Sequence, residues 1–293
     1  MTGAGDAKRG ARGGGDGLGD ARAAEDFLSG TSGQVSGIRR TSAATIADAL
    51  ADLRALALLQ PARLRRAALA SPRRRVLGLG IERTDVPGLL PAARAELLRS
   101  HHEVHFASTE AGDRGKFENL NALLAEHPVH DSDWLLVIDD DVSLPFGFLD
   151  AFLFLAERFE LRLAQPAHRR RSHAAWAVTR RHPASVVRET AFVEIGPVFA
   201  LHATTHDVLL PFPPLRAGWG LDAHWSALAQ ARGWRLGVVD ATAVRHGLRP
   251  IASSYDRAAA VQEGRAFLYG RPYTRAVEAQ RTLVTHRTWS RQA

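Results

Sequence analysis

Short apolar runs alternate with amphipathic stretches along the chain from about residue 75 onward. The apolar runs predict strands at 76–81, 103–108, 134–139, 161–165, 192–200 and 235–240. Apolar residues at helical spacing predict helices at about 89–99, 117–126, 147–158, 221–232 and 257–268. Alternating strands and helices are typical of a mostly parallel, doubly wound α/β sheet covered by helices. In such a sheet the ligand lies beyond the carboxyl ends of the strands.

The pattern is different in the first part of the chain. Residues 1–40 are rich in Gly, Ala and Asp and lack apolar periodicity, which predicts a disordered tail. From Thr41, Ile46, Leu50 and Leu53 recur at helical spacing, with charged residues on the other side. Residues 41–72 therefore predict an N-terminal helical segment, either packed on the domain or exposed to a membrane surface or partner. The remaining residues, 73–293, form the predicted catalytic-sized domain.

Composition limits the classes of partner. The formal net charge is +7, and only two of the 38 basic residues are lysines, which together with many Ala and Gly fits the codon bias of a GC-rich genome. The basic clusters at 73–75 and 168–171 lack the interleaved aromatic residues of a single-strand binder, so no nucleic-acid partner is predicted. An anionic substrate or a membrane surface accounts for the charge equally well.

The sequence contains no cysteine, which excludes disulfides and thiolate metal sites. Any metal would therefore have oxygen or imidazole ligands. No apolar run approaches the roughly 20 residues that cross a bilayer, and the first residues lack the apolar core of a signal peptide. We expect a cytoplasmic protein, with peripheral contact at the inner face of the membrane as the open alternative.

Three adjacent carboxylates, Asp139, Asp140 and Asp141, follow the apolar run at 134–138. Adjacent carboxylates in a partly desolvated cleft repel one another unless a cation lies among them. Mn²⁺ or Mg²⁺ fits, because these hard ions prefer oxygen ligands and accept phosphate as a co-ligand. The alternative is a solvated acidic turn that helps to cap a helix beginning near Pro145.

The stretch GKFENLN, residues 115–121, has an unusual composition for this chain. It contains both asparagines, Asn119 and Asn121, and one of the two lysines, Lys116. Their retention in an Arg-rich chain indicates that amide and ammonium chemistry is required here. A Lys ammonium and two amides at a helix start suit a diphosphate and a ribose or base edge. An exposed, well-capped helix start is the alternative.

The stretch AGWGLDAHW, residues 217–225, combines a flexible turn with an indole and a carboxylate. Gly218 and Gly220 flank Trp219, and Asp222 follows at a predicted helix start. Sugars stack on indoles, and a carboxylate at such a place orients or deprotonates a hydroxyl. The alternative is a core Trp with a capping Asp.

A last stretch, RLGVVDATAVRH, leads from a predicted strand to His246, for which a surface histidine is the alternative. Taken in order, GKxxNLN, the strand ending in DDD, GWGLD and VVDxxxxxH resemble the GT-A glycosyltransferase fold with its DXD motif. The segments LAQPA, FVEIGPVFA, GWGLD and LGVVD are most similar to the uncharacterised domain-of-unknown-function family 707. The resemblance covers about residues 75–250 and implies a GT-A-like, Rossmann-like fold.

This resemblance implies roles on the donor side of a sugar transfer. Residues implied to hold the nucleotide are Lys116, Asn119, Asp139 and Asp140. Residues implied to hold a Mn²⁺ or Mg²⁺ cofactor are Asp141, Asp139 and His246. In these roles Asp139 contacts the ribose or base, and Asp141 binds the metal through the donor diphosphate.

On the acceptor side, the resemblance implies that Trp219 and Asp222 meet the acceptor. Asp222 is the implied catalytic base, and Glu194 is implied to lie on a strand facing the cleft as a second catalytic candidate. The chain departs from the related GWGGED motif here, because aligning on WG puts Asp222 on the first acid and Ala223 on the second. The identity of the base is thereby left open.

The resulting expectation is a metal-dependent glycosyltransferase that moves a sugar from a nucleotide-diphosphate sugar to an unknown acceptor hydroxyl, by inversion if Asp222 is the base. The acceptor class, whether glycan, lipid or small molecule, is open. One alternative is a nucleotidyltransferase acting on a sugar phosphate, which would release pyrophosphate. The other is a non-catalytic module that binds a nucleotide sugar or glycan.

Overall fold

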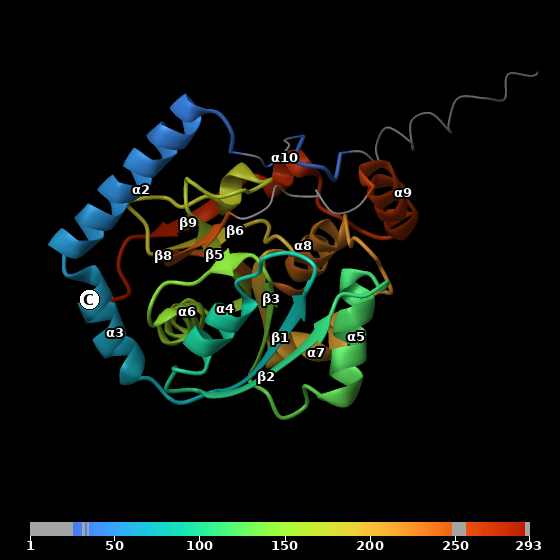
Figure 1. Cartoon of the computed structure of the whole chain (residues 1–293), viewed down its shortest axis with the longest axis horizontal. Helices are drawn as coiled ribbons and strands as arrows, with labels where there is room; N and C mark the ends of the chain where they lie inside the picture. The colour runs from blue at the N-terminus through green and yellow to red at the C-terminus, as the bar shows by residue number, and fades with distance from the viewer. Residues whose placement is uncertain (1–25, 31–32, 34, 248–255, 291–293) are drawn as a thin grey trace, which may run out of the picture.

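The computed structural model describes residues 26–30, 33, 35–247 and 256–290 (Figure 1). Within these residues a central sheet has the strand order β2-β1-β3-β7-β5-β8-β6-β9, with β4 paired to β8. The strands are β1 (Arg75–Glu82), β2 (Glu103–Glu110), β3 (Trp134–Asp139), β4 (Val142–Ser143), β5 (Leu161–His168), β6 (Val187–Thr190), β7 (Val198–His202), β8 (Arg235–His246) and β9 (Thr282–His286).

Most strands of the described sheet point the same way. β1 is parallel to β2 and β3, and β5 is parallel to β8. Only β7 and β6, within the strand order given above, run antiparallel to the strands on both sides of them. The predicted α/β class, with a mostly parallel sheet flanked by helices, is confirmed.

Helices cover both faces of the sheet because side chains alternate along each strand. Trp134 and Leu136 of β3 point into a core shared with α3, α4 and α6, whereas Leu135 and Val137 point into a core shared with α5, α8 and α9. Figure 1 shows α4 and α6 on one side of β1 and β3, and α5 on the other. The helices are α2 (Ile38–Ala57), α3 (Gln60–Leu69), α4 (Leu90–Leu97), α5 (Lys116–Glu126), α6 (Phe148–Arg158), α7 (His206–Leu209), α8 (Leu221–Arg232), α9 (Arg257–Leu268) and α10 (Ala276–Ala279).

Two strands differ from their predicted bounds by more than three residues at one end. β8 continues past residue 240 to His246, since its last residues pair with β4. The strand predicted over 192–200 begins only at Val198. Phe192 is buried there, but the backbone N–H of Glu194 donates to the side-chain oxygen of Gln165 at 2.5 Å instead of to a neighbouring strand. The prediction that Glu194 lies on a strand is therefore wrong, and it lies in a buried loop before β7.

The N-terminal part also differs from its prediction. The helix expected from Thr41 is α2, which begins at Ile38, and α3 follows it. Of the tail predicted to be disordered, residues 1–25, 31–32 and 34 lie outside the described residues. Phe27, however, is only 1% exposed and belongs to the core that contains α8 and α9. The prediction of a disordered tail is wrong at this residue.

Among the described residues, none of the helices combines the length and the apolar character that crossing a bilayer requires.

Candidate active site

A pocket of about 870 Å³ lies at the edge of the sheet where β1 and β3 end. The residues that the sequence predicted for the site all line it: Lys116, Asn119, Asp139, Asp140, Asp141, Glu194, Trp219, Asp222 and His246. They come from α5, from the end of β3 and the turn after it, from the loop before β7, from the turn before α8 and its first residues, and from the end of β8. The fold thus brings together every predicted site residue, while the role of each stays a prediction.

The first two of the three carboxylates at the end of β3 have different partners. Asp139 Oδ1 lies 2.6 Å from Lys116 Nζ, and the Asp139 side chain is about one-third exposed. Asp140 Oδ2 accepts the backbone N–H of Arg83 at 3.1 Å and lies 4.0 Å from Arg83 Nε. Asp140 therefore fastens the loop after β1, whereas Asp139 faces the open pocket.

The third carboxylate, Asp141, lies against His246 because of a strand pairing. β4 pairs antiparallel with β8 so that Val142 is opposite His246. His246 Nε2 lies 3.0 and 3.1 Å from the two carboxylate oxygens of Asp141. Burial disfavours the charged ring, but the hydrogen bond and charge of Asp141 and the charge of Asp139 outweigh it and raise the pKa of His246. Carboxylate oxygens converging with a ring nitrogen form a donor set that a divalent cation accepts.

Lys116 contacts both a carboxylate at the end of β3 and the backbone at Ile195 and Arg216. Its ammonium contacts Asp139 and donates to the carbonyl oxygen of Ile195 at 2.9 Å. Its backbone N–H donates to the carbonyl of Arg216 at 2.9 Å. At Gly115 a Cβ would lie 2.1 Å from the Cα of Arg216, so only glycine permits this approach. The start of α5 is thereby docked against the turn that carries Trp219.

The two asparagines of this stretch bind backbone. Asn119 is 2% exposed, and its side-chain nitrogen donates to the carbonyl of Ala111 at 2.8 Å. Asn121 donates to the carbonyl of Phe212 at 2.8 Å and accepts its N–H at 2.9 Å. These amides hold neighbouring loops in place, and a direct contact between Asn119 and a nucleotide stays a prediction.

The turn at 216–220 is fixed from two sides. Gly218 has φ +78°, and a Cβ there would lie 2.0 Å from the ring of Phe117, so the position requires glycine. Glu263 of α9 accepts the backbone N–H groups of Arg216, Ala217 and Gly218 at 2.6, 2.9 and 3.0 Å. The turn therefore has a defined position at the wall of the pocket.

Trp219 at the tip of this turn is half-buried and lines the pocket. The guanidinium of Arg257 lies 5.4 Å from the centroid of its ring, within the range of a cation–π contact. The indole is thus held by a second side chain of α9.

Asp222 lies in the first turn of α8 and is 8% exposed. Its Oδ1 accepts the backbone N–H of Ala223 at 2.9 Å. Burial raises the pKa of Asp222 to about 7, and the charge of Glu194 acts in the same direction, against the hydrogen bonds from Ala223 and Ile195. A carboxyl group with a pKa near the working pH suits a general base.

Glu194 is oriented by buried groups. One carboxylate oxygen lies 2.8 Å from His168 Nε2, and the other accepts the backbone N–H of Trp176 at 3.0 Å. His168 is 1% exposed. Both carboxylate oxygens of Glu194 are therefore engaged, and its role as a second catalytic candidate stays a prediction.

Several residues of the site were not predicted from the sequence: Arg83, Arg216, Arg257, Glu263 and His168. These three arginines do not stand out in the sequence, because nearly all basic residues of the chain are Arg. Glu263 occurs within an ordinary helical pattern, and His168 ends a strand beside a basic cluster. Only their positions in space connect them to the pocket.

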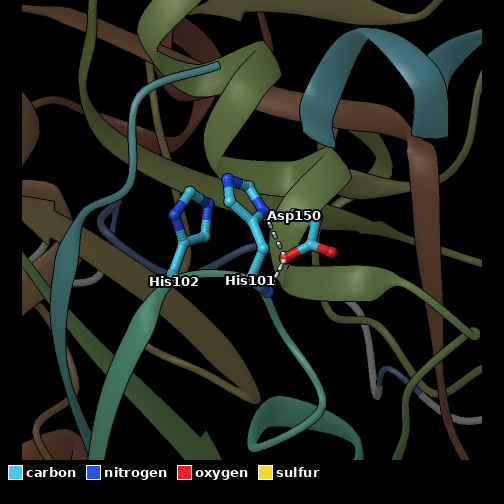
Figure 2. A group of neighbouring side chains, drawn as sticks. All are labelled: His101, His102 and Asp150. Carbon is cyan, nitrogen blue, oxygen red and sulfur yellow. Dashed lines mark hydrogen bonds and ion pairs between the residues drawn. The ribbon is translucent and has the colours of Figure 1, made fainter. Parts of the chain in front are cut away.

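A second group of potential metal ligands lies outside the pocket (Figure 2). His101, His102 and Asp150 place one potential ligand atom each within 4.8 Å of one another, so by spacing this group could hold a metal ion. His102 Nδ1, however, accepts the backbone N–H of Arg74 at 3.1 Å. The neutral ring therefore carries its hydrogen on Nε2, and a metal could bind either nitrogen only after the bond to Arg74 is broken. Of the metal ligands predicted in the pocket, Asp141 and His246 are in contact whereas Asp139 pairs with Lys116, and their role as metal ligands stays a prediction.

Neither a protein-family model nor a curated protein sequence matches the chain. Among solved structures, the chain is similar to GalNAc-T7 with UDP, GalNAc and Mn²⁺, with 10% sequence identity and a TM-score of 0.44, over 67% of this chain and 48% of that chain. The chain thus spans about half the length of that protein. It is also similar to the inositol-1-phosphate CTP transferase from T. maritima, with 10% identity and a TM-score of 0.33, over 69% of this chain and 98% of that chain.

Proposed function

We propose that this protein is a metal-dependent glycosyltransferase that moves a sugar from a nucleotide-diphosphate sugar to an acceptor hydroxyl with inversion. We place it, by the ordered motifs of its sequence, in the GT-A superfamily, nearest to family 707. The observation that carries the proposal is the composition of one pocket. It combines a cationic and acidic cluster on one side with a buried carboxyl of pKa about 7, Asp222, on a separate part of the chain.

On the donor side, Lys116 and Arg83 line the pocket near the carboxylates. Their positive charge suits the negative charge that a nucleoside diphosphate gains as it leaves. A Mn²⁺ or Mg²⁺ ion held by Asp141, Asp139 and His246 would neutralise more of that charge when bound. The partly exposed Asp139 is available to a ribose hydroxyl or a base edge.

On the acceptor side, Trp219 offers an indole to a sugar or other flat ligand, and Asp222 accepts a proton. The acceptor oxygen forms a bond to C1 of the donor sugar as the bond from C1 to the phosphate oxygen breaks. The hydroxyl proton passes to Asp222, and the nucleoside diphosphate leaves with the bonding electrons. A single displacement of this kind inverts the configuration at C1.

Of the two rivals, the non-catalytic module loses its best support from sequence. The missing second acid would stand at Ala223, which is fully buried in the core that contains α8. An acid there would lie in apolar surroundings instead of in the pocket. The nucleotidyltransferase differs in its point of attack, the α-phosphate, and therefore in its product.

The first test identifies the donor. The protein is heated with UDP, GDP, CMP or dTDP, each with and without Mn²⁺. A nucleotide present at 100 times its Kd raises the free energy of unfolding by about 2.7 kcal/mol, which is visible as a shift in Tm. If none of the three diphosphates UDP, GDP and dTDP stabilises the protein, or if CMP alone does, the proposed donor class is wrong.

The second test separates the reactions by product. With the matching nucleotide sugar, transfer or slow hydrolysis should release nucleoside diphosphate, whereas a nucleotidyltransferase supplied with nucleoside triphosphate and sugar phosphate releases pyrophosphate.

Asp222→Asn should keep nucleotide affinity and lose roughly 10²- to 10⁴-fold in rate, as expected when a positioned base is removed. In the wild type, the rate should rise with pH through about 7, as Asp222 ionises. A near-normal rate for Asp222→Asn at unchanged Tm would move the base role elsewhere, with Glu194 as the next residue to test.

A further inference from the structure

Helix α2 turns its acidic residues toward the protein. Asp48 is 4% exposed, and its carboxylate accepts the backbone N–H groups of Arg170 at 2.8 Å and Arg171 at 2.9 Å. Asp52 forms an ion pair with Arg181 at 2.5 Å and another with Arg169. α2 is therefore attached to the 168–181 segment by carboxylates instead of by an apolar face.

The opposite side of α2 is apolar and exposed. Ile46, Leu50, Leu53 and Leu56 follow one another at helical spacing, and each is between 60% and 64% exposed. A surface helix of a globular domain normally buries such a stripe. Figure 1 shows α2 along one edge of the molecule, with α3 continuing from it at an angle. The exposed stripe consequently marks a surface that another body covers.

The charge around this stripe is positive. Arg40 lines a hollow on the inner side of α2 beside Asp48, and the other exposed arginines of α2 and α3 are Arg39, Arg54, Arg63, Arg65 and Arg66. The acidic residues of the two helices are Asp48 and Asp52, and both are paired on the inner side. The outer surface of α2 and α3 therefore presents apolar side chains among uncompensated positive charges.

We propose that this face, the exposed side of α2 with its arginines and those of α3, binds an anionic lipid surface. An apolar stripe among arginines is typical of helices that lie in the membrane interface, where the apolar side chains enter the acyl boundary and the arginines meet lipid phosphates. A second copy of the chain fits less well, because the same face would bring its five arginines against five others. The proposal goes beyond the transferase function and does not depend on it.

The test uses the full chain and sedimentation with vesicles. Vesicles of phosphatidylcholine with about one third phosphatidylglycerol should bind it at least about tenfold better than phosphatidylcholine alone. The binding should weaken strongly as the salt concentration rises from about 0.1 to 1 M, since the Debye length falls from about 10 to 3 Å.

Two double variants distinguish vesicle binding through this face from nonspecific vesicle binding. Leu50→Gln with Leu53→Gln should lower binding to the anionic vesicles at least about tenfold, with an unchanged Tm because both side chains are mostly exposed. Leu98→Gln with Leu283→Gln is the matched control, since these leucines are 50% and 57% exposed, directly after α4 and on β9. It should bind as the wild type does. Donor nucleotide binding should be the same in all three proteins, because these leucines do not line the pocket.

Three outcomes would overturn the proposal. The first is equal or absent binding of the wild type to the two kinds of vesicle. The second is an equal loss in the control variant. The third is a dimer in sedimentation equilibrium that Leu50→Gln with Leu53→Gln dissolves, which would make the face a contact between two copies.

Discussion

Asp140 and Asp141 are adjacent in the sequence but contact different parts of the structure. Asp140 accepts the backbone N–H of Arg83, whereas Asp141 lies against the His246 ring. The sequence indicates that the three carboxylates are functional candidates, but it does not reveal their division among different partners. That division depends on the turn after β3 and on the pairing of β4 with β8, neither of which follows from a run of like residues.

The division predicts a contrast between two conservative variants. Asp141→Asn should weaken Mn²⁺-dependent nucleotide binding by more than about 100-fold, because loss of an outer-shell partner of a metal ligand alone costs 10- to 100-fold. Asp140→Asn should leave metal dependence unchanged and lower the free energy of unfolding by about 1 kcal/mol, as the amide still accepts from Arg83. Calorimetric titration with Mn²⁺ and nucleotide, together with urea unfolding, checks both. Equal losses of binding in the two variants would contradict the assignment of Asp141 as the ligand.

His102 predicts a pH dependence of stability. Burial, and then the charge of His101, lower the pKa of His102 to about 4 from 6.5. Between these pH values the unfolded chain binds a proton at His102 that the folded chain does not, so the free energy of unfolding falls as the pH falls, by about 3 kcal/mol in total.

His102→Asn removes the titration and keeps an acceptor for the Arg74 N–H. Its unfolding free energy, measured in urea at several pH values, should fall less steeply than that of the wild type between pH 6.5 and 4. Parallel curves for the two proteins would show that His102 does not contribute.

At the scale of elements, the hydrophobic pattern was sufficient where a strand or helix has a clear apolar side. Helices α8 and α9 begin and end at the predicted residues. The pattern failed at β6, in which Arg188 is buried because its Nε donates to Asp240 of β8 at 2.8 Å. A strand stabilised by a buried ion pair has no apolar alternation for a sequence to reveal. The same applies to the loop at Glu194, where apolar residues are buried without joining the sheet.

The link between α9 and the turn at 216–218 predicts a local effect on both stability and binding. Glu263→Ala leaves three backbone N–H groups without their acceptor, which should cost about 1–3 kcal/mol. Because the turn also positions Trp219, acceptor binding should weaken more than nucleotide binding. Urea unfolding and KM for each substrate measure the two effects. Glu126→Ala, an exposed Glu at the end of α5, is the control and should change neither; a KM for acceptor that stays at the wild-type value in Glu263→Ala would refute the link.

At the scale of the whole molecule, the site is assembled from most of the chain length. Its lining residues run from Phe27 to Glu263. The sequence indicated which stretches carry the chemistry, because Asp, Lys, Asn and Trp stand out there against an Arg- and Ala-rich background. It could not indicate the N-terminal contribution, since one Phe among Gly, Ala and Asp forms no periodic pattern.

Phe27 provides the test of that contribution. Phe27→Ala should lower the free energy of unfolding by about 3–5 kcal/mol, the usual cost of removing a fully buried aromatic ring. Leu69→Ala, at a leucine that is 48% exposed on α3, should change it by less than about 0.5 kcal/mol. Urea unfolding of both variants decides the matter, and a Phe27→Ala protein as stable as the wild type would restore the prediction of a tail without structure.

The position of Phe27 also sets the order in which the protein is completed during synthesis. Its ring packs against Gly220 and Gly264, so one side of the contact is made early and the other late in translation. At roughly 5–20 residues per second, the ribosome needs on the order of 10 to 50 s to reach Gly264 after Phe27. Throughout that interval the ring of Phe27 lacks the Gly264 side of its contact. The wall of the pocket therefore closes only after α9 has been made, and a chain stalled before α9 lacks the part of the pocket wall that Arg257 and Glu263 form.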